Sequence, residues 1–208
     1  MVARLAAGTA GGTVLDVGCG RGLTVEALRR QGVDCVGVEL APVEPLEAVR
    51  PYVFAGQDVF ALPEDLRRRV TAILLLDVVE HLAAPEEFLA TLAARFDRLE
   101  RIVVTVPARA ELWSNYDEFY GHVRRYDRAS LRALLEPVGR GGTSSGYFFH
   151  ALYPVLRLAL ALRPDRPIAH AAPRARWAHR LAAGLLALEQ RALPRSWWGT
   201  SLWGVAER

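Results

Sequence analysis

The sequence predicts an α/β fold in which helices cover both faces of a mostly parallel, doubly wound sheet. Short apolar runs alternate with helical patterns from residue 13 to about residue 137, and this alternation is typical of such folds. The run at 73–76 is apolar at every position, as a central strand buried on both faces should be. A length of 208 residues, 51% of them hydrophobic, suits one domain with a sizeable core, and we expect residues 1–208 to form it.

The expected elements follow this alternation in order. We predict strands at 13–17, 34–38, 52–55, 70–76, 101–106, 143–149 and 201–208, and helices at 22–31, 43–49, 63–68, 85–96 and 127–137. Pro85 fits a first helical turn, where its missing N–H is no loss, and Asp127 is expected to cap the helix that follows it. Two mostly helical insertions interrupt the pattern after the fifth and sixth strands, at 107–126 and 150–199, the second with a linker rich in proline and arginine at 163–174.

Composition limits the classes of protein to which the chain can belong. All 26 basic residues are arginines, the net charge is only +3, and no RNA-binding module is visible, so we expect no nucleic-acid partner. The two cysteines, Cys19 and Cys35, suggest neither a disulfide nor a ligand set, so we expect no metal and a reducing compartment. No signal segment and no run of about 20 apolar residues is present, which favours the cytoplasm.

The most informative motif is the run Val-Leu-Asp-Val-Gly-Cys-Gly-Arg-Gly at 14–22. An apolar strand leads into Gly18, Gly20 and Gly22, and a helical pattern starts at Leu23. Glycine lets the backbone turn tightly or lie against a ligand, and a strand that leads through such a turn into a helix is a common nucleotide-binding corner. A dinucleotide fingerprint, G-x-G-x-x-G, needs its third glycine at position 23, which is leucine here. The spacing therefore argues against an NAD-dependent oxidoreductase.

With Asp16 two residues before the first glycine, this run resembles motif I of the class I S-adenosylmethionine-dependent methyltransferases, whose pattern is close to L-D-x-G-x-G-x-G. The resemblance covers about residues 13–149 and the C-terminal end. It implies a Rossmann-like methyltransferase fold of seven strands in the order 3-2-1-4-5-7-6, with the last strand antiparallel. It also implies S-adenosylmethionine as the cofactor and S-adenosylhomocysteine as the product. The helices that often precede motif I in the family are nearly absent here, so the two insertions are expected to form the substrate lid.

Acidic residues after the next strands complete the cofactor site that this resemblance implies. Glu39 follows the second strand about 20 residues past the glycine loop, where an acid accepts hydrogen bonds from ribose hydroxyls. Asp58 and Val59 resemble the family's pair in which an acid binds the adenine amino group and an apolar neighbour packs on the ring; a turn aspartate is the alternative for Asp58. The expected cofactor-binding residues are Asp16, Gly18, Cys19, Gly20, Gly22, Glu39, Leu40, Asp58, Val59, Asp77, Val78 and His81.

The fourth strand ends in the run 77–82, Asp-Val-Val-Glu-His-Leu, at the edge of the sheet where ligands bind in such folds. Its pattern D-x-x-E-H-L resembles the small-molecule and quinone-type members of the class. The Asn/Asp-Pro-Pro-Tyr/Phe motif of enzymes that methylate amines of DNA bases does not follow this strand. We interpret Glu80 as structural, tying the loop to nearby backbone. His81 is open to three interpretations: a cofactor contact, a general base or a structural histidine.

The segment 113–126 carries the expected acceptor site, and its pattern W-S-x-x-D…G-H-x-R-R-Y resembles a bacterial subgroup of the same class. Methyl transfer from a sulfonium is an in-line displacement, and a protonated nucleophile needs a nearby base, most often histidine. We expect His122 as the first candidate base, His81 as the second, and Tyr126 to orient the nucleophile. The expected substrate-binding residues are Trp113, Tyr116, Tyr120, Arg124 and Arg125. The alternative for the two arginines is that they pair with Asp117 and Glu118 and pin the insertion.

The C-terminal part of the chain is basic and rich in tryptophan. Residues 150–208 hold nine arginines, three acids and four of the five tryptophans, and residues 176–193 show an amphipathic helical pattern. Such a helix can pack on its own domain, cover an apolar substrate, form a dimer contact or lie on a membrane surface. The sequence leaves these four alternatives open, and with them a monomer or a homodimer and a cytoplasmic or membrane-peripheral location.

The leading hypothesis is methyl transfer from S-adenosylmethionine to a small-molecule or lipid-linked acceptor, at oxygen, nitrogen or carbon. The principal alternative is a protein that binds S-adenosylmethionine without catalysis, because binding and turnover are separate properties. An NAD-dependent oxidoreductase and a nucleic-acid methyltransferase are less well supported. The acceptor cannot be named from the glycine loop, since the information lies in 107–126 and 150–199.

Overall fold

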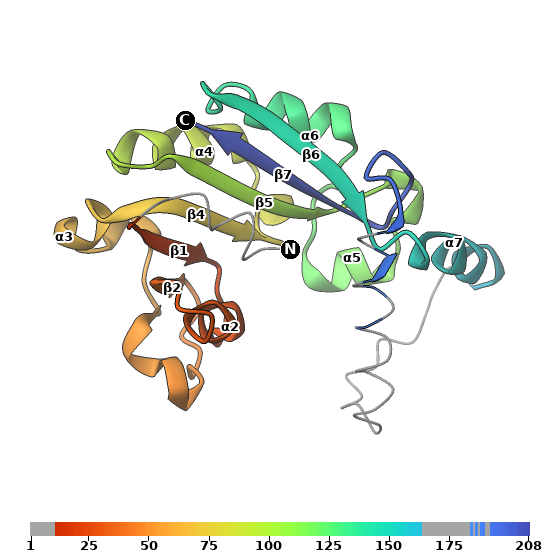
Figure 1. Cartoon of the computed structure of the whole chain (residues 1–208). Helices are drawn as coiled ribbons and strands as arrows, with labels where there is room; N and C mark the ends of the chain where they lie inside the picture. The colour runs from red at the N-terminus through yellow and green to blue at the C-terminus, as the bar shows by residue number, and fades with distance from the viewer. Residues whose placement is uncertain (1–10, 164–183, 185, 187, 190–191) are drawn as a thin grey trace.

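The computed structural model describes residues 11–163, 184, 186, 188–189 and 192–208. Seven strands form one sheet in the order β3-β2-β1-β4-β5-β7-β6 (Figure 1), which confirms the predicted order. β7 runs antiparallel to both of its neighbours, and the other pairs are parallel. The strands are β1 (Thr13–Val17), β2 (Cys35–Glu39), β3 (Val53–Ala55), β4 (Val70–Leu76), β5 (Arg101–Pro107), β6 (Gly142–Phe148) and β7 (Ser201–Glu207).

Helices and short 3-10 turns fill the connections. They are α2 (Leu23–Arg29), η1 (Glu47–Tyr52), η2 (Val59–Ala61), α3 (Glu64–Arg67), η3 (Val79–His81), α4 (Pro85–Arg95), η4 (Ala110–Leu112), α5 (Asn115–Tyr120), α6 (Arg128–Leu135) and α7 (Leu152–Leu162). Pro85 begins α4, as predicted. Asp127 caps α6, because its Oδ1 accepts a hydrogen bond from the Ser130 N–H at 2.7 Å.

The predicted helix at 43–49 is wrong. The chain instead forms the 3-10 helix η1 at Glu47–Tyr52. Pro45 lies inside the predicted range, where it lacks the N–H that a helix needs and pushes the residue before it toward an extended conformation. In the second insertion the structure describes α7. The predicted linker beyond Arg163 lies outside the described residues, as does most of the predicted amphipathic segment 176–193.

The core lies on both faces of the sheet. Leu15 and Val17 of β1 point to the face covered by α4 and α6, whereas Val14 points to the face covered by α2, because side chains alternate along a strand. Figure 1 shows α2 on the opposite side of the sheet from α4 and α6. β4 is central, and its residues Val70–Leu75 are buried on both faces. The apolar run that predicted this strand therefore reflects burial from two sides.

Candidate cofactor and active site

A cavity of about 410 Å³ opens at the carboxyl ends of β1, β2 and β4. The strand order reverses between β1 and β4, so the connections leave the sheet in opposite directions and a crevice forms between them. The lining residues are Val17, Gly18, Val38, Glu39, Leu40, Gln57, Asp58, Val59, Asp77, Val78, His81, Leu82 and Phe88. Eight of the predicted cofactor-binding residues are among them. The others, Asp16, Cys19, Gly20 and Gly22, lie in or under the loop beside the cavity.

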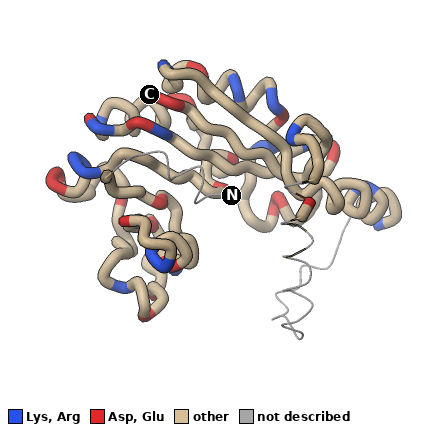
Figure 2. The backbone as a smooth tube through the Cα atoms, viewed as in Figure 1, with Lys and Arg blue, Asp and Glu red and all other residues tan. Residues whose placement is uncertain are grey.

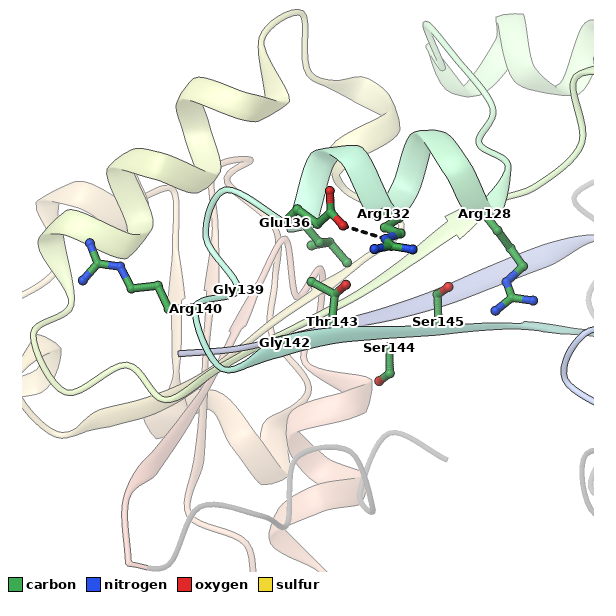
Figure 3. A pocket seen from close by; sticks show the side chains of 10 residues that line it. Arg128, Arg132, Glu136, Gly139, Arg140, Gly142, Thr143, Ser144 and Ser145 are labelled. Carbon is green, nitrogen blue, oxygen red and sulfur yellow. Dashed lines mark hydrogen bonds and ion pairs between the residues drawn. The ribbon is translucent and has the colours of Figure 1, made fainter.

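A second cavity, of about 450 Å³, lies between α6 and the edge strand β6 (Figure 3). Its lining is polar and includes Arg128, Arg132 and Arg140, with Arg132 held by Glu136 at 2.6 Å. None of the predicted site residues lines it. We therefore assign the candidate site to the first cavity.

The glycine loop needs glycine for two different reasons. Gly18, Gly20 and Gly22 all have positive φ, at 73°, 52° and 89°. A Cβ on Gly22 would lie 2.8 Å from Val53 Cγ2, and one on Gly18 would lie 2.8 Å from Val78 Cγ2. A Cβ on Gly20 would meet no atom within 4 Å. Gly18 and Gly22 are thus fixed by packing, whereas Gly20 keeps open space beside the loop.

Glu39 is fixed by backbone at the mouth of the cavity. Its Oε2 accepts a hydrogen bond from the Gly20 N–H at 2.9 Å, and its Oε1 accepts one from the Ala41 N–H at 3.0 Å. A carboxylate has about four lone-pair sites, so each oxygen keeps capacity for a ligand hydroxyl. The contact joins the end of β2 to the glycine loop and holds the carboxylate in a fixed position at the mouth of the cavity.

Asp16 lies buried beneath the loop, on β1 between Gly37 of β2 and Leu74 of β4. Burial, and then the charge of Glu39, raises the pKa of its carboxyl from 3.8 to about 7. A carboxyl that is costly to ionise in the ligand-free protein would be relieved by a nearby positive charge. The sulfonium of S-adenosylmethionine is such a charge.

Asp58 is held in a turn and lines the cavity. Its Oδ1 accepts a hydrogen bond from the Phe60 N–H at 2.8 Å and so caps η2, as a turn aspartate does. The residue also lines the cavity together with Val59. The turn therefore holds the carboxylate in a fixed position at the cavity wall.

Asp77 has a strained backbone conformation at the cavity. Its φ is 56°, a left-handed conformation that is uncommon outside glycine and is typical of functional turns. The N–H donates to the Thr105 carbonyl at 3.0 Å, and Thr105 Oγ1 donates to Oδ1 at 3.4 Å. Burial raises the pKa of the Asp77 carboxyl, although Thr105 and the neighbouring His122 and His81 oppose this effect. The turn aims the side chain into the cavity.

His81 and His122 meet beside the cavity although they come from different loops. Their ring centroids are 4.8 Å apart in an edge-to-face arrangement. Nδ1 of His122 lies 2.9 Å from Asp117 Oδ1, and Nδ1 of His81 lies 3.3 Å from the Gly121 carbonyl oxygen. Each ring is thus held at Nδ1 and leaves Nε2 free of these contacts.

Asp117 is the buried centre of the insertion after β5. Arg125 donates to both of its oxygens, at 2.8 and 3.0 Å, and the Ser114 N–H donates at 2.9 Å. Burial opposes its ionisation, but the hydrogen bonds from Arg125 and His122 outweigh this and hold the pKa of the carboxyl below 3.8. Asp117 therefore stays ionised and orients His122.

The contacts of Arg125 match the predicted pairing with Asp117, whereas Arg124 holds the insertion through backbone carbonyls and not through Asp117 or Glu118. Arg124 donates to the carbonyls of Leu82 and Ala83 at 3.1 and 3.0 Å, which ties the insertion to the loop after β4. Arg125 is engaged by Asp117 and by the Ala108 carbonyl at 2.9 Å. Neither lines the cavity. A substrate-binding role for them stays a prediction that these contacts do not favour.

The predicted aromatic residues divide into two groups. Tyr126 is buried, its hydroxyl donates to the Val79 carbonyl at 3.4 Å, and burial raises its pKa to about 12. This places its hydroxyl under η3 and outside the cavity lining, which favours a structural role. Tyr120 is exposed and lies 6.4 Å from the His122 ring, with Tyr116 6.4 Å from Tyr120. Trp113 is 38% exposed on the same insertion.

Glu80 has a buried side chain whose surroundings the sequence did not predict. The residue ties the loop to nearby backbone, as predicted, because its main-chain carbonyl accepts a hydrogen bond from the Val123 N–H at 2.9 Å. The side chain is fully buried, and within the described part of the chain neither carboxylate oxygen has a hydrogen-bond partner. Burial raises the pKa of this carboxyl to about 8. The signal available in the sequence was the adjacency of Glu80 and His81 at a strand end.

Glu80, His81 and His122 also form a group of possible metal donors among the described residues, with one donor atom of each within 4.8 Å of the others. No metal was expected from the sequence, because Cys19 and Cys35 suggest no ligand set. The fold instead assembles these donors from two separate loops, which spacing in the sequence could not reveal.

The strand order and the cavity at the β1–β4 crevice define a class I methyltransferase fold. A family profile described as a methyltransferase domain matches residues 1–139, and the chain belongs to this family. The solved structure of a SAM dependent methyltransferase from Archaeoglobus fulgidus is 18% identical, with a TM-score of 0.55 over 96% of this chain and 87% of that chain. That similarity bears on the fold alone.

Curated relatives match a shorter segment. The mitochondrial ubiquinone biosynthesis O-methyltransferase of Arabidopsis thaliana is 33% identical over 91 residues, which are 38% of this chain and 27% of the relative. The ubiquinone biosynthesis O-methyltransferase of Azorhizobium caulinodans is 40% identical over 76 residues, 34% of this chain and 30% of the relative. The matches thus span less than a third of each relative's length.

Proposed function

We propose that the protein is an enzyme that transfers the methyl group of S-adenosylmethionine to a hydroxyl oxygen of a small-molecule acceptor. The observation that carries this proposal is the cavity at the β1–β4 crevice, where the glycine loop, Glu39 and Asp58 are fixed by backbone hydrogen bonds. Oxygen is chosen as the acceptor atom because the curated relatives are named O-methyltransferases.

The fixed groups support one assignment of residues to the parts of the cofactor. Glu39 would accept hydrogen bonds from the ribose hydroxyls, and Asp58 would accept one from the adenine amino group while Val59 packs on the ring. Asp16 lies below the glycine loop, where its charge would favour the sulfonium. The residues present fit the cofactor, since the carboxylates are preorganised and the cavity of about 410 Å³ falls in the range of ligand sites.

The chemistry is an in-line displacement at the methyl carbon. The acceptor oxygen forms a bond to the methyl carbon, the S–CH₃ bond breaks, and its electron pair returns to sulfur as S-adenosylhomocysteine forms. The hydroxyl proton must leave, and Nε2 of His122 is the first candidate to receive it, because Nδ1 is held by Asp117. His81 is the second candidate.

The insertion 107–126 would act as a wall of the acceptor site. Hydrogen bonds hold it to the loop after β4. They include Val123 N–H to Glu80 O, the contact between Gly121 O and His81 Nδ1, and Arg124 to the Leu82 carbonyl. Within this insertion the aromatic side chains of Trp113 and Tyr120 are exposed. An acceptor with a flat, apolar ring fits such a surface.

A lipid-linked acceptor is the finer form of this proposal. α7 carries exposed Val155, Leu158 and Leu162, and the exposed rings of Trp197 and Trp198 stack at 6.2 Å. Such an apolar surface suits a lipid tail or a membrane interface. Among the described residues, no helix is long and apolar enough to cross a bilayer. Flotation with anionic vesicles tests the contact, and no enrichment with vesicles would remove the membrane version.

The test of the proposed function is transfer of a labelled methyl group to a panel of phenols and matched amines. We expect label on phenolic oxygen. S-Adenosylhomocysteine binding without transfer to any acceptor would favour the non-catalytic alternative. A His122→Ala variant should lose turnover while it binds S-adenosylhomocysteine normally; full turnover in this variant would remove His122 from the mechanism.

A further inference from the structure

Three donor groups converge where η3 meets the end of the insertion after β5. Glu80 and His81 belong to η3, and His122 follows α5. One donor atom of each lies within 4.8 Å of the others. His81 also lines the cofactor cavity, so the group borders the space where the acceptor is expected.

The first argument for a ligand is Glu80. Its side chain is fully buried, and both carboxylate oxygens are without a hydrogen-bond partner among the described residues. A buried carboxyl without hydrogen bonds is unfavourable in either form: it stays protonated with its polar atoms unpaired, or it ionises when a cation binds beside it. Arg125 does not pair with this carboxyl by hydrogen bonding, because it donates to Asp117 and to the Ala108 carbonyl. A bound cation would satisfy Glu80.

The second argument is the orientation of the two imidazole rings. Asp117 holds Nδ1 of His122, and Arg125 in turn holds Asp117; the Gly121 carbonyl lies at Nδ1 of His81. A histidine that ligates a metal through one nitrogen almost always has the other nitrogen held by a carboxylate or a backbone carbonyl. Both histidines already have this arrangement, one of each kind, which leaves their Nε2 atoms as ligands.

We propose that Glu80, His81 and His122 bind a divalent transition-metal ion, with zinc-like chemistry, beside the cofactor cavity. Two imidazoles and one carboxylate suit Zn²⁺, Co²⁺ or Mn²⁺ better than Ca²⁺. Ligands at about 2.1 Å from a tetrahedral zinc are about 3.4 Å apart, so the donors must draw together on binding. The exposed His81 side chain can supply this movement.

The role of the ion rests on the proposed function. Three protein ligands leave a position for the acceptor hydroxyl, and a metal lowers the pKa of a bound hydroxyl. The two histidines would then serve as ligands, and the hydroxyl proton would pass to solvent water before the oxygen attacks the methyl carbon. An acceptor with a hydroxyl is therefore favoured over one with an amine.

The test is metal binding by the full chain after treatment with a chelator. Co²⁺ is titrated while its visible absorption is recorded, and Zn²⁺ is titrated by calorimetry. We expect one ion per chain and a Co²⁺ spectrum of low-symmetry coordination. Glu80→Gln should weaken binding at least tenfold, and Glu87→Gln, at an exposed position of α4, should leave it unchanged.

Glu80→Gln keeps the shape of the side chain and, like the protonated carboxyl, carries no charge, so the variant should fold about as stably as the wild type without metal. No stoichiometric binding by the wild type, or equal binding by Glu80→Gln, would overturn the proposal. S-Adenosylhomocysteine binding measured on the same samples separates the two proposals: cofactor binding without metal binding refutes only the metal site. Loss of both would count against the proposed function as well.

Discussion

Replacing Asp16 with asparagine is expected to stabilise the ligand-free protein at pH 8. The wild-type carboxyl is buried under the glycine loop and its pKa is raised from 3.8 to about 7, first by burial and then by Glu39. Between these two values the folded protein retains a proton that the unfolded chain has released. The free energy of unfolding therefore falls as pH rises through this window, and the loss is complete above about pH 7.

The magnitude follows from the two pKa values. At about 1.4 kcal/mol for each pH unit, the buried charge costs the folded protein about 4 kcal/mol at pH 8. A buried asparagine amide that lacks full hydrogen bonding costs about 1–3 kcal/mol. The free energy of unfolding of the variant should thus exceed that of the wild type by about 1–3 kcal/mol at pH 8. At pH 5 this difference should be smaller by about 2–3 kcal/mol.

Urea unfolding at pH 5 and pH 8 measures both quantities. Asp65→Asn, at an exposed position of α3, is the matched control and should change stability by less than about 0.5 kcal/mol at either pH. A stability difference between Asp16→Asn and wild type that does not depend on pH would refute the reasoning. The same variant should bind S-adenosylmethionine more weakly, because the charge that favours the sulfonium is gone.

Three further variants probe other contacts. Glu39→Gln should lower S-adenosylhomocysteine affinity at least tenfold in calorimetry, since it removes the charge fixed by the Gly20 N–H; unchanged affinity would contradict the ribose assignment. Asp117→Asn breaks a buried pair with Arg125, so it should lower the free energy of unfolding in urea at pH 7 by about 3–5 kcal/mol. A decrease of less than about 1 kcal/mol would show that the pair is dispensable. Gly22→Ala should destabilise far more than Gly32→Ala: both glycines have positive φ, but only at Gly22 would a Cβ collide with Val53. Equal effects would contradict the packing argument.

The sequence was sufficient for the sheet and for the main features of the cofactor site. Alternating apolar runs and helical patterns predict the doubly wound α/β sheet, and the resemblance to class I methyltransferases implies the order of its seven strands. The residues after parallel strands, such as Glu39 and Asp77, lie at one edge of the sheet, so their convergence on a cavity could be anticipated.

The partners of charged side chains could not be predicted, because tertiary packing decides them. Arg125 finds Asp117 rather than facing the cavity, and Arg124 reaches carbonyls of another loop. Glu80 and His122 are far apart in the sequence, and no spacing rule brings them together. Pro45 was a visible signal against the helix at 43–49, and it outweighed the apolar pattern.

The measurement that tests the central claim most directly is the free energy of unfolding with S-adenosylhomocysteine, with NAD and with no ligand. S-Adenosylhomocysteine at about 100 times its dissociation constant should raise the free energy of unfolding by about 2.7 kcal/mol, and NAD should leave it unchanged. The reason is that Leu23 stands where a dinucleotide loop needs glycine, while Glu39 and Asp58 are fixed at the cavity. Stabilisation by NAD and none by S-adenosylhomocysteine would contradict the account.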